Sequence, residues 1–325
     1  MAFSADQLLE KVNTYLATMP YVREPKGLYA PIEYVLSLGG KRIRPVLMLL
    51  SYQLYKENVD DILPQAAGIE TYHNYTLLHD DLMDCADMRR NKPTVHKVWD
   101  ENTAILSGDA MLVLAYRLMN NCLERYLRQV MDIFSQTALE ICEGQQWDME
   151  FETRNDVTVP EYMEMIRLKT SVLLSAALKI GAVLGGASED DARKLYDFGI
   201  KMGLAFQLQD DYLDVYGDSK VFGKNIGGDI LCNKKTFMLI NALALADGIQ
   251  RKELEKWIAS TAFCPEEKIK AVTALYDKIG IGGICEEKIN AYYVEGLSLL
   301  ESIAVPSERK EELKSFVCHL MNRKV

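Results

Sequence analysis

The sequence lacks several features that would place it in other classes of protein. No apolar run is long enough to cross a membrane, because the closest stretch, 170–186, is interrupted by Ser171, Ser175 and Lys179. The seven cysteines form no Cys-x-x-Cys pair, and no secretory signal pattern opens the chain. We therefore expect no zinc site and no disulfide framework, but reduced thiols in a cytoplasmic protein.

Basic residues are also fewer than acidic residues. The count of 37 basic against 47 acidic residues gives a formal net charge of −10 and a pI near 5.1. This balance argues against a nucleic-acid partner and against an anionic membrane surface. No Pro-, Gly- or Ser-rich linker divides the 325 residues, and strand-like alternation is absent. We expect one all-α domain over residues 1–325, a bundle of about a dozen helices around a central cavity.

Helix boundaries follow from capping signals and from glycines. Ser4-x-x-Gln7 and Thr158-x-x-Glu161 are capping boxes, and Gly39-Gly40 is expected to stop a helix. The predicted helices cover 5–19, 31–38, 42–55, 61–83, 102–126, 128–152 and 158–186, then one from 188 through 214, and four or five shorter ones after 235, with Gly280–Gly283 between two of them. Polar or glycine-rich loops are expected at 85–94 and 217–233.

An acidic signature occurs twice in the predicted helices. Asp80-Asp81-Leu82-Met83-Asp84 and Asp210-Asp211-Tyr212-Leu213-Asp214 lie 210 − 80 = 130 residues apart. On a helix, positions i and i+4 share one face, so the outer aspartates of each triplet point the same way. Six carboxylates facing each other across a cavity would repel unless cations lay between them. All-oxygen ligands suit Mg²⁺ that bridges to phosphate.

Basic clusters accompany the acidic triplets. They are found at Gly39–Pro45, at Asp87–Pro93, at Lys169-Thr170, at Gly223-Lys224 and at Asn233–Thr236. Arginine binds diphosphate oxygens in a bidentate manner, and lysine adds a compact charge. Acid beside base in this arrangement indicates a site that holds metal and polyphosphate together.

These motifs resemble the trans-isoprenyl diphosphate synthases of the polyprenyl synthetase family. The matching segments follow the family's order across residues 37–236: Gly-Gly-Lys-Arg-Ile-Arg-Pro (39–45), the first triplet with Arg89-Arg90, Gly144-Gln145, Lys169-Thr170, the second triplet after Phe206-Gln207, and Gly223-Lys224. Asn91 departs from the glycine that is usual after the two arginines, which affects the geometry of the loop more than its chemistry.

The resemblance implies head-to-tail prenyl transfer, in which an allylic diphosphate ionises and isopentenyl diphosphate attacks the allylic carbon. It implies Mg²⁺, with three ions expected, because negative charge develops on the leaving diphosphate. Asp80, Asp84 and Asp210 are the first candidates for ligands. Asp81, Asp211 and Asp214 either ligate directly or act through water.

Further roles come from the same resemblance. Arg89, Lys169 and Lys224 would bind the allylic diphosphate, and Lys234 is a further substrate-binding candidate. Isopentenyl diphosphate would be held without metal by Lys41, Arg44, His73 and Arg90. The Thr170 hydroxyl, the Gln207 amide oxygen and the Lys169 carbonyl would face the carbocation. The alternatives without a role in substrate binding are a histidine of the core for His73 and a surface charge for Lys234.

Product length is expected to depend on the residues that precede the first triplet. Tyr75 and Tyr72 lie five and eight positions before Asp80, and Thr76 lies four before it. In related enzymes an aromatic residue at the fifth position accompanies products of fifteen to twenty carbons. We therefore expect geranylgeranyl diphosphate or a farnesyl/geranylgeranyl mixture, with Tyr75 as the floor of the channel.

Other functions stay open at this point. A longer-chain polyprenyl synthase would have small residues at 72 and 75. A class I terpene cyclase normally carries an Asn/Asp-Ser/Thr-Glu second motif and has no need for residues 39–45. A non-catalytic partner subunit usually loses one aspartate motif, whereas both are intact here. The resemblance also implies a homodimer.

Overall fold

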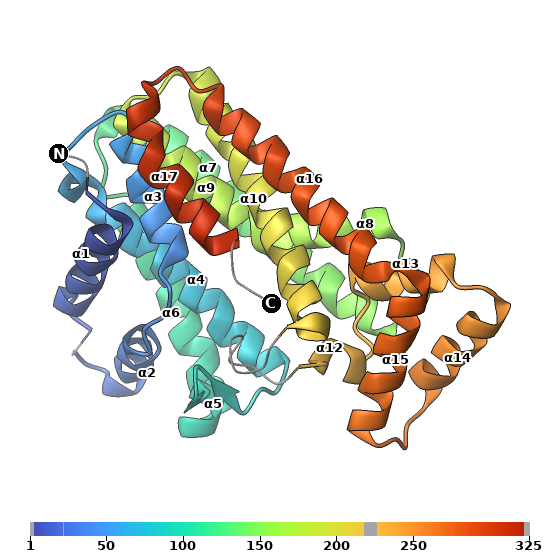
Figure 1. The fold of residues 1–325 in the computed structure, drawn as a ribbon. Helices are drawn as coiled ribbons and strands as arrows, with labels where there is room; N and C mark the ends of the chain where they lie inside the picture. Colours follow the sequence, from blue (N-terminus) through green and yellow to red (C-terminus); the bar gives the residue numbers. More distant parts are fainter. Residues whose placement is uncertain (1–2, 22, 218–225, 322–325) are drawn as a thin grey trace. The chain divides into compact units, whose positions relative to one another are not determined.

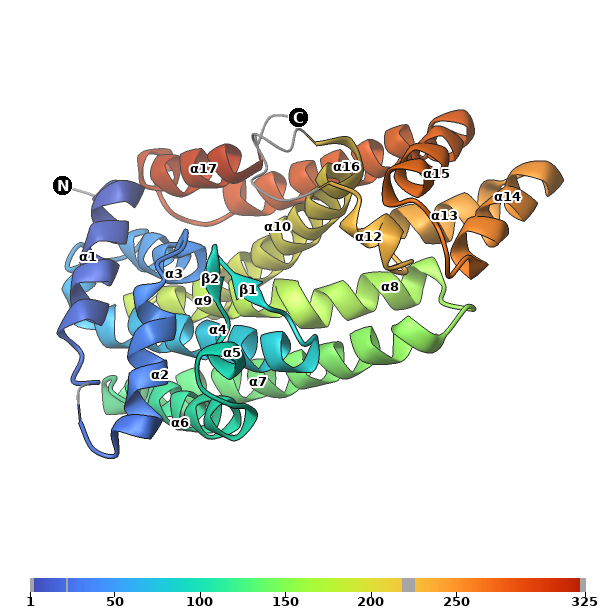
Figure 2. The same ribbon diagram turned by 90° about the horizontal axis from the view of Figure 1, so that it is seen from below.

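The computed structural model describes residues 3–21, 23–217 and 226–321. Figures 1 and 2 show that the regular elements among these residues are helices, apart from one short hairpin, β1 (Met88–Arg89) with β2 (Lys92–Pro93). The all-α prediction is confirmed. The helices are α1 Ala5–Thr18, α2 Lys26–Ser37, α3 Ile43–Gln53, α4 Leu63–Met83, α5 Val95–Val98, α6 Glu101–Met119, α7 Glu124–Thr153, α8 Val159–Ile166, α9 Val172–Gly185, α10 Glu189–Tyr216, α12 Gly228–Leu231, α13 Phe237–Leu245, α14 Gly248–Ala259, α15 Pro265–Ile279, α16 Ile281–Glu301 and α17 Ser307–Met321.

The helices group into two compact units. The first unit comprises 1–136, 176–196 and 303–313, and the second comprises 137–175, 197–302 and 314–325. Each unit therefore contains segments that are distant in the sequence. The first acidic triplet belongs to the first unit and the second triplet to the second unit. The single domain expected from the sequence stays a prediction.

The capping signals are confirmed, but some predicted boundaries are wrong. Both capping boxes form, with Ser4 preceding α1 and Thr158 preceding α8. The helix predicted over 102–126 ends at Met119, because the Gln65 side chain on α4 donates to the carbonyls of Leu118 (3.2 Å) and Asn121 (2.5 Å). A partner so distant in sequence satisfies the helix end that local signals leave open.

Two other local predictions also need correction. The loop at 85–94 contains the hairpin β1–β2, and the loop at 217–233 contains α12. Gly280, at φ +84°, separates α15 from α16 as expected, but the two glycines at 282 and 283 lie inside α16. A hairpin of two-residue strands is too short for an alternation pattern to show.

In the first unit, α4 packs along α6, while α2 and α3 pack beside them. The core between α2, α4 and α6 is apolar and includes Ile32, Leu36, Leu78 and Met111. Burial of each such side chain stabilises the folded state by about 1.5–3 kcal/mol, and this fixes α4 along its length. The first triplet lies at the C-terminal end of this anchored helix.

In the second unit, α10 is held by an apolar core shared with α8, α13, α15 and α16. Its members include Tyr162, Leu208, Phe237, Leu275 and Ile281. Leu208 is fully buried and immediately precedes the polar run that carries the second triplet.

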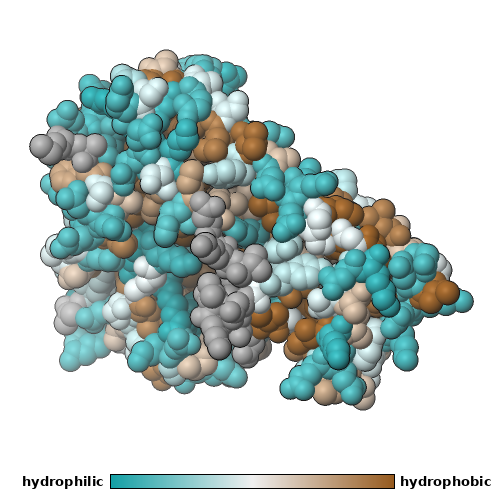
Figure 3. Space-filling model, viewed as in Figure 1, coloured by the Kyte–Doolittle hydropathy of each residue, from teal (hydrophilic) through white to brown (hydrophobic). Residues whose placement is uncertain are grey.

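On the face shown in Figure 3, hydrophilic side chains predominate and hydrophobic ones occur singly or in small groups, so the helices turn most of their apolar surface inward.

One continuous helical stretch has an unusually apolar composition. Among the described residues, Val159–Gly185 is the stretch that is long and apolar enough to cross a bilayer, and 83% of its most apolar window is buried within the protein. Its length exceeds the run 170–186 that the sequence suggested. Such burial is typical of a core helix.

Gly181→Ala is expected to lower the free energy of unfolding by about 1–3 kcal/mol. A Cβ at Gly181 on α9 would lie 2.2 Å from the Met48 carbonyl oxygen of α3, so two packed helices would have to separate. Urea unfolding measures the change. Gly283→Ala on α16 is the matched control, because nothing lies within 4 Å of its Cβ position and the helix should gain up to about 1 kcal/mol. Equal effects of the two substitutions would contradict the close packing of α3 and α9.

Candidate active site

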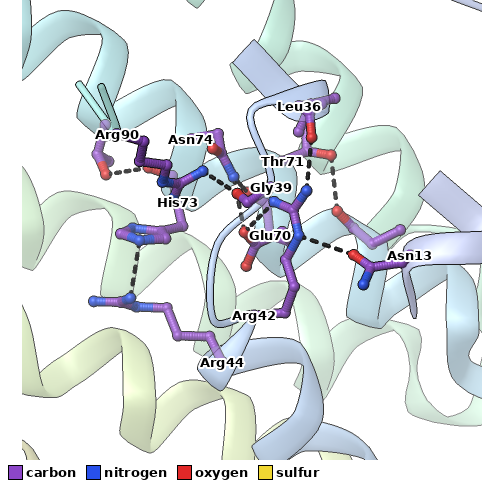
Figure 4. Close-up of polar contacts among 12 residues, drawn as sticks. Asn13, Leu36, Gly39, Arg42, Arg44, Glu70, Thr71, His73, Asn74 and Arg90 are labelled. Carbon is purple, nitrogen blue, oxygen red and sulfur yellow. Dashed lines mark hydrogen bonds and ion pairs between the residues drawn. The ribbon is translucent and has the colours of Figure 1, made fainter. Parts of the chain in front are cut away.

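A basic pocket lies in the first unit, where the loop 39–42 passes α4 and the hairpin. The cavity has a volume of about 440 Å³, and its lining includes the four residues predicted to bind isopentenyl diphosphate, Lys41, Arg44, His73 and Arg90. Figure 4 shows Arg44, His73 and Arg90 on one side of the loop and Arg42 on the other. The sequence-predicted set is thus brought together within one unit.

Arg42 also lines this pocket, but its guanidinium is engaged in the packing of four helices. Its backbone has φ +46°, and its guanidinium donates to Glu70 Oε1 (2.7 Å) and to the Leu36 carbonyl (2.6 Å). Asn13 accepts a weaker bond from Nε at 3.3 Å, and Asn74 donates to the same Glu70 oxygen at 2.9 Å. Only a few per cent of either ionic side chain is exposed. Because the pair is buried and compensated, Glu70 does not oppose an anion in the pocket.

His73 is a neutral partner of Arg44. The Arg44 Nη1 lies 3.0 Å from His73 Nε2, so the arginine donates and the ring nitrogen accepts. Burial lowers the pKa of His73 well below its ordinary value, and Arg44 and Arg90 lower it further. Burial also lowers the pKa of Arg44 to about 10, against a raising effect of Glu70. Crowded cations of this kind favour a bound anion such as diphosphate.

Arg90 is positioned by the turn of the hairpin. Arg90 and Asn91 have φ of +51° and +60°, which the turn between β1 and β2 requires. Asparagine tolerates this conformation better than most residues, so Asn91 can replace the glycine usual in related sequences. The Arg90 guanidinium donates to the Gly39 carbonyl, and a Cβ on Gly40 would lie 2.8 Å from its Cζ. Glycine at position 40 therefore leaves the space that this arginine occupies.

The first acidic triplet ends α4, and its middle member is buried. Asp81 is 5% exposed, and both of its carboxylate oxygens accept from Arg89 Nε at 2.8 and 2.7 Å. Arg89 also lies 3.8 Å from Asp80 through Nη2. Asp80 is more accessible, and Asp84 is exposed one turn further on. Arg89, predicted to bind diphosphate, here compensates the triplet itself.

The second triplet on α10 repeats this pattern with different partners. Asp211 is 3% exposed and accepts from the Tyr162 hydroxyl and from Gln207 Nε2 at 3.1 Å. Burial raises the pKa of Asp211 to about 7, and the charge of Asp229 adds to the effect. Asp214 is half-buried and accepts from the Asp229 backbone N–H at 2.9 Å. In both triplets the outer aspartates are the accessible ones.

The donor set suits magnesium better than a metal held by protein alone. Across residues 3–21, 23–217 and 226–321, no group of three or more His, Cys, Asp or Glu side chains forms a ready metal cage. Accessible carboxylates one turn apart, such as Asp80 and Asp84, supply two oxygens each and leave positions for water and substrate. Mg²⁺ typically uses one or two carboxylates together with waters and phosphate oxygens. The residues present therefore fit this ion.

Lys169 and Thr170 lie in a π-helical turn, Arg167–Ser171, between α8 and α9. Such turns recur at functional sites. A Cβ on Gly144 of α7 would lie 2.5 Å from the Lys169 nitrogen, so glycine permits the close approach. The Lys169 ammonium pairs with Asp148 at 2.5 Å, and the Thr170 hydroxyl donates to Gln207 Oε1 at 3.1 Å. The three predicted catalytic residues thus belong to one polar cluster of the second unit.

The structure adds two acidic residues that the sequence analysis missed. Asp148 pairs with Lys169, and Asp229 lies 4.0 Å from the Lys234 ammonium through Oδ1. Asp148 follows Gly144-Gln145 by one helical turn, which was a usable signal. Asp229 lies in α12, whose four residues are too few to show a periodicity, so no signal identified it. Lys224, also predicted to bind substrate, lies outside the described residues.

The predicted chain-length residues lie on α4 before the first triplet. Tyr72 is 1% exposed and its ring packs against Phe134, with centroids 5.2 Å apart, and against Tyr75 at 5.4 Å. Tyr75 also contacts His79 at 4.8 Å. The Thr76 hydroxyl donates to the His73 carbonyl at 2.8 Å. Tyr72 is a core residue, whereas half-buried Tyr75 stays the candidate floor.

Comparison with known proteins shows the family to which the chain is similar. The polyprenyl synthetase family profile matches residues 25–276. A short chain isoprenyl diphosphate synthase of Methanocaldococcus jannaschii is 41% identical over 273 residues, which are 84% of this chain and 83% of the relative. A geranylgeranyl diphosphate synthase of Methanosarcina mazei is 44% identical over 223 residues, 68% of this chain and 69% of the relative. The crystal structure of a geranylgeranyl pyrophosphate synthase, 44% identical, has a TM-score of 0.92 and covers 99% of this chain and 98% of its own.

The chain therefore belongs to the polyprenyl synthetase family. Its class is that of the trans-isoprenyl diphosphate synthases, which are prenyltransferases. The resemblance drawn from its motifs is confirmed.

His73→Gln is expected to reduce the loss of the free energy of unfolding that occurs as the pH falls below about 6.5. Because the pKa of His73 is lowered in the folded protein, the unfolded chain takes up a proton below about pH 6.5 that the folded protein does not. The stability due to neutral His73 is complete above that pH, and it falls by up to about 1.4 kcal/mol per pH unit below it. Urea unfolding between about pH 5 and 7 measures the slope.

His319→Gln is the control for this prediction. His319 is exposed on α17, so its replacement should leave the slope as in the wild type. Parallel profiles of the wild type and His73→Gln would show that the ring takes up its proton in the folded protein.

Proposed function

We propose that the protein is a Mg²⁺-dependent short-chain prenyltransferase that condenses isopentenyl diphosphate with an allylic diphosphate. The allylic C–O bond breaks, and the double bond of isopentenyl diphosphate supplies the electrons of the new C–C bond. A proton then leaves the adjacent carbon, and the departed diphosphate accepts it. Mg²⁺ held by the outer aspartates of the triplets would supply positive charge to the leaving diphosphate.

The basic pocket and the acidic triplets differ in how they can bind a phosphate, and this difference carries the proposal. The pocket around Arg44, His73 and Arg90 would bind an anion without metal, through Lys41, Arg44 and Arg90, and its carboxylate, Glu70, is paired with Arg42. The triplets require metal to bind a phosphate. An enzyme with two diphosphate substrates needs both modes, whereas a terpene cyclase has one substrate and needs only the second. The cyclase alternative is thereby disfavoured.

The proposal assigns Mg²⁺ ions, three in number, to both triplets. Asp80, Asp84 and Asp210 are the expected ligands, and Asp214 is accessible enough to join them. Asp81 and Asp211 are occupied by Arg89 and by Tyr162 with Gln207, so they orient the outer carboxylates or act through water. Because the middle residue of each triplet has its own partners, ligation falls to the outer pair.

The other side chains act on the substrates. Lys41, Arg44, His73 and Arg90 would hold isopentenyl diphosphate, while Arg89, Lys169 and Lys234 would hold the allylic diphosphate. The oxygens of Thr170 and Gln207 are proposed to face the carbocation. Their mutual hydrogen bond orients both without presenting a basic nitrogen that the cation could alkylate.

Self-association and compartment are part of the proposal. Ile105, Leu106 and Val113 on α6 are exposed apolar residues, which supports a homodimer formed through this helix. The seven cysteines are free, which supports a reducing, cytoplasmic setting. Geranylgeranyl diphosphate, or a mixture with farnesyl diphosphate, is the proposed product, because Tyr75 is aromatic and half-buried.

Condensation itself is the first test. Purified protein with isopentenyl diphosphate and each allylic primer should form C15 or C20 diphosphate with Mg²⁺ and none with chelator, measured by mass spectrometry. Asp80→Ala and Asp210→Ala should each lower kcat by a factor on the order of 10² or more, because charge stabilisation of the leaving group is lost. Asp132→Asn, at an exposed site on α7, is the control. Absence of product with every primer would favour a non-catalytic partner subunit, and a cyclic hydrocarbon would favour the cyclase.

Tyr75→Ala should shift the product distribution toward longer chains, because removing the ring opens space beneath the first triplet. The measurement is the ratio of C25 and longer products to C20 after dephosphorylation. Thr76→Val is the control, since it replaces the hydroxyl that is bonded to the His73 carbonyl by a methyl group and leaves the size of the side chain unchanged. An unchanged distribution for Tyr75→Ala would mean that another residue ends the channel.

A further inference from the structure

Lys268 on α15 is a buried lysine that the proposed mechanism leaves unused. Its side chain is 1% exposed, and within the described parts of the chain it takes part in no ion pair with a carboxylate. Its ammonium donates to the Leu231 carbonyl at 3.2 Å and to Asn233 Oδ1 at 2.8 Å, and it lies 4.3 Å from the Phe263 ring centroid. A buried charge without a counter-ion is costly, so this arrangement requires an explanation beyond packing.

The two oxygens bound by Lys268 belong to the segment that precedes Lys234. Leu231 is the last residue of α12, and Asn233 has φ +54°, a conformation that needs support from its surroundings. The Asn233 amide also donates to the Ile258 carbonyl at 3.1 Å. Lys268 therefore fixes the chain direction immediately before Lys234.

The same segment is tied to the second triplet at its other end. The backbone N–H groups of Gly227 and Asp229 donate to the Asp214 carbonyl (2.6 Å) and to its carboxylate (2.9 Å). The Lys234 N–H donates to the Asp229 carbonyl at 2.9 Å. A small cavity of about 20 Å³ is lined by Asp211, Asp229, Lys234 and Lys268 together.

We infer that Lys268 is a positioning residue that holds Asp229 and Lys234 in register with the second aspartate triplet, and so sets the affinity for the magnesium complex of the allylic diphosphate. The inference rests on the proposed function. Its physical basis is that one buried ammonium bonds to two oxygens of a ten-residue segment, 227–236, whose far end bonds to Asp214.

The test is Lys268→Met, which keeps the length of the side chain and removes its charge. We expect the KM for the allylic substrate and the Mg²⁺ concentration for half-maximal rate each to rise about tenfold, as is typical when a hydrogen bond to a charged group is lost. The KM for isopentenyl diphosphate should stay unchanged, because that site is built from other residues. Lys270→Met, two residues along α15 and exposed, is the matched control and should change neither KM.

Asn233→Gly provides a second route, since glycine accepts the positive φ and the side chain that accepts from Lys268 is removed. It should raise the allylic KM as well, and the two effects should be less than additive in the double variant, because both substitutions break the Lys268–Asn233 hydrogen bond, while each also breaks one bond of its own, to Leu231 or to Ile258. If Lys268→Met does not fold, the allylic KM of Asn233→Gly alone tests the positioning role. Additive effects, an unchanged allylic KM, or an equal rise in both KM values would overturn the positioning role. A wild-type protein without condensation activity would instead overturn the proposed function.

Discussion

Compensation of charge between packed helices is the interaction on which both units depend. A buried ion without a partner destabilises a fold by several kcal/mol, and the motifs place many ions among apolar helices. Arg42 with Glu70 joins the loop 39–42 to α4. Lys169 with Asp148 joins the π turn to α7. The Arg42–Glu70 pair is complete in the protein alone and holds the scaffold, whereas the Lys169 of the second pair is also proposed to meet the allylic diphosphate.

The two triplets show how this constraint divides residues of one type into different roles. Successive helical residues point about 100° apart, so the middle aspartate turns toward the protein when the outer two face outward. Asp81 meets a cation, Arg89, whereas Asp211 meets the neutral donors Tyr162 and Gln207. The difference has a consequence for charge: burial raises the pKa of Asp211 to about 7. Identical sequence signatures therefore differ in their electrostatics.

Backbone strain is concentrated near the same groups. Among the described residues, the non-glycine positions with positive φ are Arg42, Cys85, Arg90, Asn91 and Asn233. Each lies within or beside a motif that carries a candidate site residue. Such conformations persist only where surrounding contacts determine them. Here the contacts are the Glu70 carboxylate for Arg42, the Gly39 carbonyl for Arg90 and the Lys268 ammonium for Asn233.

The sequence by itself determined the fold class, the capped starts of α1 and α8, and the identity of the acidic and basic motifs. These depend on local periodicity, on capping chemistry and on residue type, all of which are readable along the chain. Tertiary structure decided where α6 ends, because Gln65 of α4 satisfies its last carbonyls. It also decided that the Arg42 guanidinium pairs with Glu70 while Arg44 pairs with His73, that the Asp229 N–H bonds to Asp214, and that Lys268 bonds to the segment before Lys234. Such roles depend on partners far away in the sequence, and only the packing of the helices determines which partner each charge meets.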